Sequence, residues 1–116
     1  MLWHSIGYDP ARWDAVAHRL TQTHRLLRIG ARGHGASDAP EGHDAMATLA
    51  GDVLAVMDPA GIGQAAFCGL SLGGMIGRWL TVHAPGRHDR FVFANAAAAL
   101  PRNPWNARAQ PVRAQG

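Results

Sequence analysis

A serine stands between two glycines in the segment Gly69-Leu70-Ser71-Leu72-Gly73. An apolar run precedes this Gly-x-Ser-x-Gly pattern at residues 65–68, and a helix-like run follows it at residues 75–83. A strand, a tight turn and a helix in that order are the context in which such a serine acts as a nucleophile. Glycine is needed on both sides because the turn is crowded. The pattern therefore predicts a nucleophilic Ser71 at a helix N-terminus, where backbone N–H groups favour negative charge.

A second interpretation of the same segment stays open. Serine is also a preferred residue at the start of a helix, where its side-chain oxygen accepts a hydrogen bond from the first turn. In that case the segment is a glycine-rich turn between a strand and a helix, and Ser71 only caps the helix.

The elements that must position this serine alternate along the chain. Apolar residues at helical spacing alternate with short apolar runs that end at glycine or proline. We expect helices over residues 10–20, 45–57 and 72–83, a loop over 31–42, and strands at residues 1–3, 25–29, 64–68 and 91–94. The run at 91–94 is apolar throughout, which is typical of a central parallel strand. On the first helix we expect Trp13, Val16 and Leu20 to belong to the core.

This alternation predicts an α/β fold with about four parallel strands and helices on both faces, a three-layer αβα arrangement. Catalytic groups in such sheets lie at the carboxyl ends of the strands. Two segments whose residue types could take part in catalysis lie at this end of the sheet: residues 4–7 and residues 69–71.

Composition excludes several classes of protein. The 116 residues fit one domain. The net charge is +3, but the basic residues are arginines scattered among acids, so we expect no nucleic-acid partner. Cys68 is the single cysteine, which rules out a disulfide within the chain. No apolar run reaches membrane length and no secretory signal opens the chain, so we expect no membrane association and a cytoplasmic location. The histidines lack metal-ligand spacing, so we expect no metal.

Three segments together resemble the α/β-hydrolase superfamily: residues 4–7, residues 32–38 and residues 69–77. Within it they are most similar to 3-oxoadipate enol-lactonases, which hydrolyse an ester bond in the β-ketoadipate route of aromatic breakdown. The resemblance implies a partial hydrolase core over residues 1–100 and the start of a cap region, or an irregular tail, over residues 101–116. Gly30 departs from the family pattern. Family members usually have aspartate two residues before the arginine of the Arg-Gly-His-Gly turn, which is Arg32 in this chain.

The resemblance also implies roles for individual residues. Ser71 would attack the carbonyl of a small ester or lactone and form an acyl-enzyme, which water then hydrolyses. The backbone N–H groups of Ile6 and Leu72 would stabilise the oxyanion, and Gly69 and Gly73 would be the glycines of the nucleophile turn. No cofactor is implied. A cofactor-free haloperoxidase or perhydrolase, or another esterase on the same fold, is the alternative activity.

The acid and the histidine of the triad are not assigned in this chain. In the family they follow the serine on later strands, and the chain ends soon after residues 91–94. We therefore expect an internal fragment of a hydrolase that is inactive alone, with a non-catalytic α/β module or a gene remnant as the alternative. Among the histidines, we expect His4 to line the pocket and His34 to make structural hydrogen bonds. Unpaired sheet edges predict self-association.

Overall fold

The structure is a computed structural model, and it describes residues 1–99, 107, 109–111 and 114. The expected tail at residues 101–116 lies for the most part outside the described residues.

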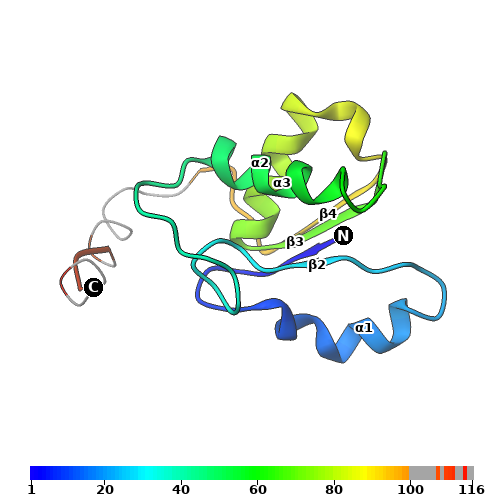
Figure 1. The fold of residues 1–116 in the computed structure, drawn as a ribbon, viewed down its shortest axis with the longest axis horizontal. Coiled ribbons are helices and arrows are strands. Elements are labelled where there is room, and N and C mark those ends of the chain that lie inside the picture. The colour runs from blue at the N-terminus through cyan, green and yellow to red at the C-terminus, as the bar shows by residue number, and fades with distance from the viewer. Residues whose placement is uncertain (100–106, 108, 112–113, 115–116) are drawn as a thin grey trace.

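Four parallel strands form a single sheet in the described part of the chain (Figure 1). They are β1 (Leu2–Trp3), β2 (Arg28–Ile29), β3 (Phe67–Leu70) and β4 (Phe91–Ala94), and their order across the sheet is β2-β1-β3-β4. In register, Trp3 lies between Ile29 and Gly69, and Leu70 lies beside Ala94. The parallel sheet expected from the alternating sequence pattern is confirmed.

The strand order decides where the helices lie. The chain moves in one direction from β1 to β2, and in the opposite direction from β2 to β3 and on to β4. Because crossovers between parallel strands are right-handed, α1 (Asp14–Leu20) covers one face, and α2 (Met46–Met57) and α3 (Leu72–His83) cover the other. Figure 1 shows α2 and α3 together and α1 apart from them.

The same reversal makes the boundary between β1 and β3 the point where the connections change direction. The connection from β1 leads toward one edge of the sheet, and the connection from β3 leads toward the other. Ligands of open α/β sheets bind at such a switch point, outside the carboxyl ends of the strands. The segments that leave β1 and β3 at this end are residues 4–7 and Ser71.

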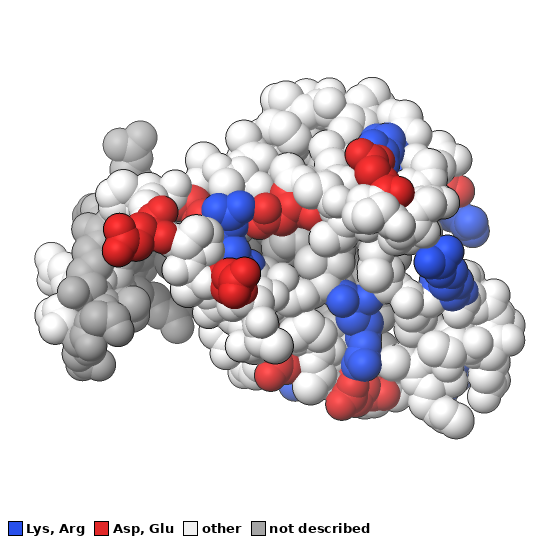
Figure 2. Space-filling view, in the orientation of Figure 1, with Lys and Arg blue, Asp and Glu red and all other residues white. Residues whose placement is uncertain are grey.

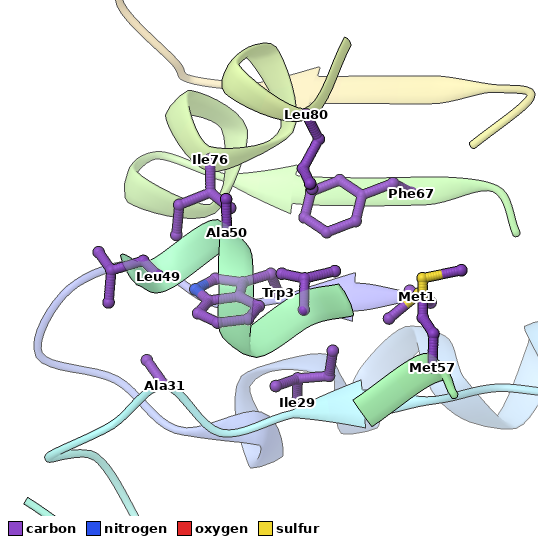
Figure 3. Packing of buried hydrophobic residues seen from close by; sticks show 11 residues of the cluster. Met1, Trp3, Ile29, Ala31, Leu49, Ala50, Met57, Phe67, Ile76 and Leu80 are labelled. Carbon is purple, nitrogen blue, oxygen red and sulfur yellow. The ribbon is translucent and has the colours of Figure 1, made fainter. Parts of the chain in front are cut away.

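The core fills the space between the sheet and the two helices that share a face. Trp3 is fully buried, and Figure 3 shows it among side chains from β2 and α2. Phe67 of β3 lies with Ile76 and Leu80 of α3, and all three are less than 2 % exposed. This burial fixes α3, and with it the turn that carries Ser71, against the centre of the sheet.

The first helix differs from the expectation. Residues 10–20 form a 3₁₀ turn (Pro10–Trp13) followed by α1, and none of these residues is buried. Val16 is 41 % exposed, and Trp13 and Leu20 are only partly buried and do not belong to the core cluster, so the expected core role of these three residues is wrong. The reason is topological, since α1 is alone on its face among the described helices while α2 and α3 support each other.

The position of β4 also differs from the expectation. An apolar run at residues 91–94 suggested a central strand, but β4 is an edge strand among the described residues. Val92 is 57 % exposed and Phe93 42 % exposed. Self-association through this edge stays a prediction of the sequence.

Charges of both signs are mixed on the surface. Figure 2 shows acidic and basic side chains interspersed on one face. Three arginines form ion pairs with aspartates from other elements: Arg28 with Asp14, Arg32 with Asp52, and Arg87 with Asp58. The most extensive is the pair of Arg32 and Asp52, joined by two bonds of 2.7 Å, and hydrogen bonding to Asp52 raises the pKa of the guanidinium.

His88 makes stability depend on pH. It is 4 % exposed, its Nδ1 lies 3.0 Å from the carbonyl oxygen of Ala65, and its ring packs on Phe67. Burial lowers its pKa below the ordinary 6.5; the Met1 amine and Arg87 lower it further, while the hydrogen bond to Ala65 and the charge of Asp89 raise it. Below pH 6.5, His88 is therefore protonated more readily in the unfolded chain than in the folded chain. The free energy of unfolding falls as pH falls through this range.

We expect His88→Phe to reduce the loss of melting temperature between pH 7.5 and pH 5.5. The same substitution at the exposed His18 is the control, and it should leave that loss unchanged. Equal losses in the His88→Phe and wild-type proteins, measured by circular dichroism, would show that His88 does not contribute.

Candidate active site

Ser71 joins β3 to α3 in a backbone conformation that ordinary residues avoid. Its φ is 53° and its ψ is −110°. Such conformations cost about 1–3 kcal/mol and persist where the surroundings impose them. Ser71 occupies the N-cap position of α3, yet its side chain makes no capping hydrogen bond. The capping interpretation of this serine is therefore wrong, and the geometry is that of a serine presented at a sharp strand-to-helix turn.

The glycines on either side of Ser71 allow the strand and helix to touch. A Cβ added at Gly69 would lie 2.2 Å from the carbonyl carbon of Gly73. A Cβ added at Gly73 would lie 2.6 Å from the carbonyl oxygen of Trp3. Both clashes are with backbone, which cannot move aside as a flexible side chain could. The role expected for these glycines thus has a steric basis in β1, β3 and α3.

Ser71 opens into a pocket of about 260 Å³. The residues that line it are mostly apolar: Ile6, Met46, Ser71, Leu72, Met75, Asn95 and Ala97. They come from the loop after β1, the start of α2, the start of α3 and the loop after β4. The segments after β1, β3 and β4 follow the carboxyl ends of parallel strands, where the fold class places ligands.

Ile6 and Leu72, the residues predicted to supply the oxyanion donors, line the same pocket as Ser71. Leu72 is the first residue of α3, so its backbone N–H has no partner within the helix. Within the described part of the chain, neither the Leu72 nor the Ile6 N–H donates a hydrogen bond to another residue. The roles of these two amides stay predictions; among the described residues, neither N–H is occupied by another hydrogen bond.

His4 does not line this pocket, contrary to the expectation. It is 1 % exposed, and its Nδ1 lies 2.8 Å from the carbonyl oxygen of Ser5. The backbone N–H of Ala31 donates to Nε2 at 3.0 Å. Burial favours the neutral ring and lowers the pKa of His4, although the hydrogen bond to Ser5 raises it. Both ring nitrogens are already engaged with backbone groups. This imidazole is not available to take a proton from Ser71.

Sequence reasoning missed four residues of the pocket: Met46, Met75, Asn95 and Ala97. Asn95 had a usable signal, because it directly follows the apolar run at 91–94 and so lies at the carboxyl end of β4. Its φ of 49° is a left-handed conformation that asparagine tolerates better than most residues. Met46 comes from the distant start of α2, and only the packing of α2 on α3 brings it to Ser71.

The described lining of the pocket contains no candidate base. None of the described residues that line it is a histidine, aspartate or glutamate. Residues 100–116 contain none of these types either.

Among the described residues, no cluster of three or more His, Cys, Asp or Glu side chains is arranged to hold a metal ion. No described helix has both the length and the apolar character to cross a bilayer.

Gly30 stands where the family usually has aspartate, and the side chain of Ser37 fills the space beside it. The hydroxyl of Ser37 donates to the Gly30 carbonyl oxygen at 3.0 Å. A Cβ at residue 30 would lie 2.8 Å from that hydroxyl oxygen, so Ser37 occupies the space that a side chain there would need.

Comparisons with known proteins agree with this geometry. The alpha/beta hydrolase fold family matches residues 2–115. The chain is 39 % identical over 113 residues to 3-oxoadipate enol-lactonase 2 of Acinetobacter baylyi, an alignment that covers 97 % of this chain and 42 % of that protein. The crystal structure of an enol-lactonase from Burkholderia xenovorans superposes with a TM-score of 0.93 at 39 % identity, covering 97 % of this chain and 44 % of that one.

A hydrolase from Pseudomonas aeruginosa superposes with a TM-score of 0.92 at 46 % identity, covering 96 % of this chain and 42 % of that one. The chain thus spans less than half the length of these relatives. The family match over nearly every residue, together with the strand order and the turn at Ser71, establishes that the chain belongs to the α/β-hydrolase family.

Proposed function

We propose that this chain carries the nucleophile and oxyanion-binding half of a serine hydrolase that acts on carboxylic esters and lactones, with 3-oxoadipate enol-lactone as the leading substrate. The observation that carries the proposal is Ser71 itself. It is held in a strained turn, does not cap α3, and opens into a pocket that Ile6 and Leu72 also line. The similarity to enol-lactonases supports the choice of substrate.

In the proposed reaction, Ser71 Oγ attacks the lactone carbonyl carbon while a base removes its proton. The carbonyl oxygen becomes an oxyanion, which the N–H groups of Ile6 and Leu72 stabilise. Collapse of this intermediate breaks the ring C–O bond and releases the enol oxygen, which is protonated and tautomerises to the ketone. Water then hydrolyses the Ser71 ester and yields the open-chain oxo acid.

The base and its orienting carboxylate come, in this proposal, from polypeptide outside these 116 residues. The pocket lining offers no such group, and residues 100–116 contain no histidine or acid. We therefore expect the chain assayed alone to hydrolyse esters near the uncatalysed rate, with or without Ser71. A large rate that depends on Ser71 would contradict this part of the proposal.

A segment exchange tests the activity directly. The 113-residue matching segment of A. baylyi enol-lactonase 2 is replaced by this chain, and the hybrid is assayed with the enol-lactone, a simple aryl ester, and peroxide with a halide. We expect hydrolysis of the enol-lactone above the other two activities. Halogenation or peracid formation as the main activity would favour a haloperoxidase or perhydrolase instead. A hybrid that folds but acts on none of the three would overturn the proposal.

A further inference from the structure

The loop that carries Ile6 is attached to the rest of the protein by two imidazole rings. Residues 4–7 leave β1 at its carboxyl end and reach the pocket through Ile6. The loop is exposed from Ile6 onward, and Gly7 has a left-handed φ of 75°. Loops of this kind need specific partners if one amide is to keep a fixed direction. His4 and His34 supply those partners, one on each side of Ile6.

His4 fixes the peptide unit that precedes Ile6. Its Nδ1–H donates to the carbonyl oxygen of Ser5 at 2.8 Å, and its Nε2 accepts from the N–H of Ala31 at 3.0 Å. The Ser5 carbonyl and the Ile6 N–H belong to one planar unit, in which the two groups point in opposite directions when the bond is trans. Holding the Ser5 oxygen therefore sets the direction of the Ile6 N–H.

His34 fixes the peptide unit that follows Ile6. Its Nε2 accepts from the N–H of Gly7 at 3.1 Å, and its Nδ1–H donates to the carbonyl oxygen of Arg32 at 3.0 Å. The rings of His34 and His4 lie 5.3 Å apart between centroids. Both rings carry their proton on Nδ1, because in each ring Nε2 faces a backbone N–H and must accept.

The turn that supplies these rings' partners is itself anchored. Arg32 forms two 2.7 Å bonds with Asp52 of α2 and a third of 3.2 Å with Asp44. A bidentate guanidinium–carboxylate pair fixes orientation as well as distance. The loop after β1 is thus connected through two imidazoles to a turn that is fixed on α2, the helix that also contributes Met46 to the pocket.

We propose that His4 and His34 form a positioning pair, which aims the Ile6 N–H at the developing oxyanion by holding the peptide units on both sides of Ile6. The inference rests on the proposed function, because it needs Ser71 as the nucleophile. Neither ring touches the reacting atoms. Their contribution is the fixed direction of one donor, and a displaced donor loses most of the stabilisation that it gives in the transition state.

The first test is direct detection of both contacts. A hydrogen bond from N–H to nitrogen gives a measurable scalar coupling between the two nitrogens in a nitrogen-15-labelled protein. We expect one coupling between Gly7 N and His34 Nε2 and another between Ala31 N and His4 Nε2. Absence of either coupling in the folded chain overturns the pair.

The second test uses phenylboronic acid to measure whether the Ile6 N–H points at the oxyanion position, in the A. baylyi enol-lactonase hybrid described above, whose remaining segments supply the base. Ser71 Oγ forms a bond to the boron atom, which becomes a tetrahedral boronate, and the serine proton goes to solvent. One boronate oxygen then occupies the oxyanion position. We expect His34→Leu to weaken binding about 10-fold or more. His34→Gln, whose side-chain oxygen can accept from the Gly7 N–H, should restore most of it. His18→Leu, on an exposed position of α1, is the matched control and should change nothing.

The outcomes separate the possible failures. Melting temperature is measured in parallel, because a purely structural His34 would lower it without changing boronate affinity in the folded protein. If the wild-type hybrid binds boronate and its His34→Leu variant binds equally well, the positioning pair is overturned and the proposed function stands. If the wild-type hybrid binds no better than its Ser71→Ala variant, the proposed function fails at the nucleophile, and the inference fails with it.

Discussion

Replacing Gly69 by alanine is expected to leave the chain unfolded or to destabilise it by about 3 kcal/mol or more, at the upper end of overpacking effects. A single methyl group is enough to cause this destabilisation, because it would lie 2.2 Å from the Gly73 carbonyl carbon and 2.6 Å from the Gly74 nitrogen. Relief would require β3 and α3 to separate, and that contact supports the burial of Phe67, Ile76 and Leu80. The total free energy of unfolding of a native domain is only about 5–15 kcal/mol, so this loss is a large fraction of it.

Gly51→Ala is the matched control for this prediction. Gly51 lies within α2, and a Cβ there meets nothing within 4 Å. Alanine should stabilise the helix by about 0.5–1 kcal/mol, since glycine is a poor helix former. Thermal unfolding followed by circular dichroism compares the two. A Gly69→Ala protein that melts within a few degrees of wild type would show that the strand and helix are not as close as the structure places them.

Ser71→Ala is expected to reduce hydrolysis by the exchanged enol-lactonase at least about 10³-fold, and nearer 10⁶-fold if the triad acts as a unit. The loss should appear in kcat, because the hydroxyl forms a bond only after the substrate is in place. Stability should not fall with it, since Ser71 makes no capping hydrogen bond that alanine would remove. Mass spectrometry of the wild-type hybrid during turnover should show an acyl group on Ser71.

Ser37→Ala provides the control for that experiment. Ser37 donates a hydrogen bond to Gly30 and does not line the Ser71 pocket. Its removal should cost about 1 kcal/mol of stability and leave kcat unchanged. A Ser71→Ala hybrid that keeps a tenth or more of the wild-type rate would mean that another group is the nucleophile.

Local signals in the sequence were sufficient for some elements and not for others. The helix expected at 72–83 has the bounds of α3, because glycine before it and Pro85 after it limit its extent. The strand expected at 91–94 has the bounds of β4. The strand expected at 64–68 is instead Phe67–Leu70, because small apolar residues precede the segment that pairs with β1 and β4. The apolar residues indicated roughly where this strand lies, and its pairing with β1 and β4 determined where it begins and ends.

The features that the sequence did not reveal depend on residues far apart in the chain. Nothing near residue 91 indicates that β4 is an edge strand here, because strand order is a property of the assembled sheet. His4 was expected in the pocket since it follows β1, but its partner Ala31 is 27 residues away. The pairing of Gly7 with His34 spans the same separation. Sequence spacing alone cannot assign a hydrogen bond of that kind.

The backbone of Ser71 has an evolutionary consequence. Glycine adopts a φ of 53° without penalty, whereas serine does so at a cost of about 1–3 kcal/mol. A laboratory selection that rewards heat resistance alone should therefore discard Ser71 in favour of glycine, and a selection for turnover should restore it. Stability and catalysis therefore make opposite demands on the residue at this one position.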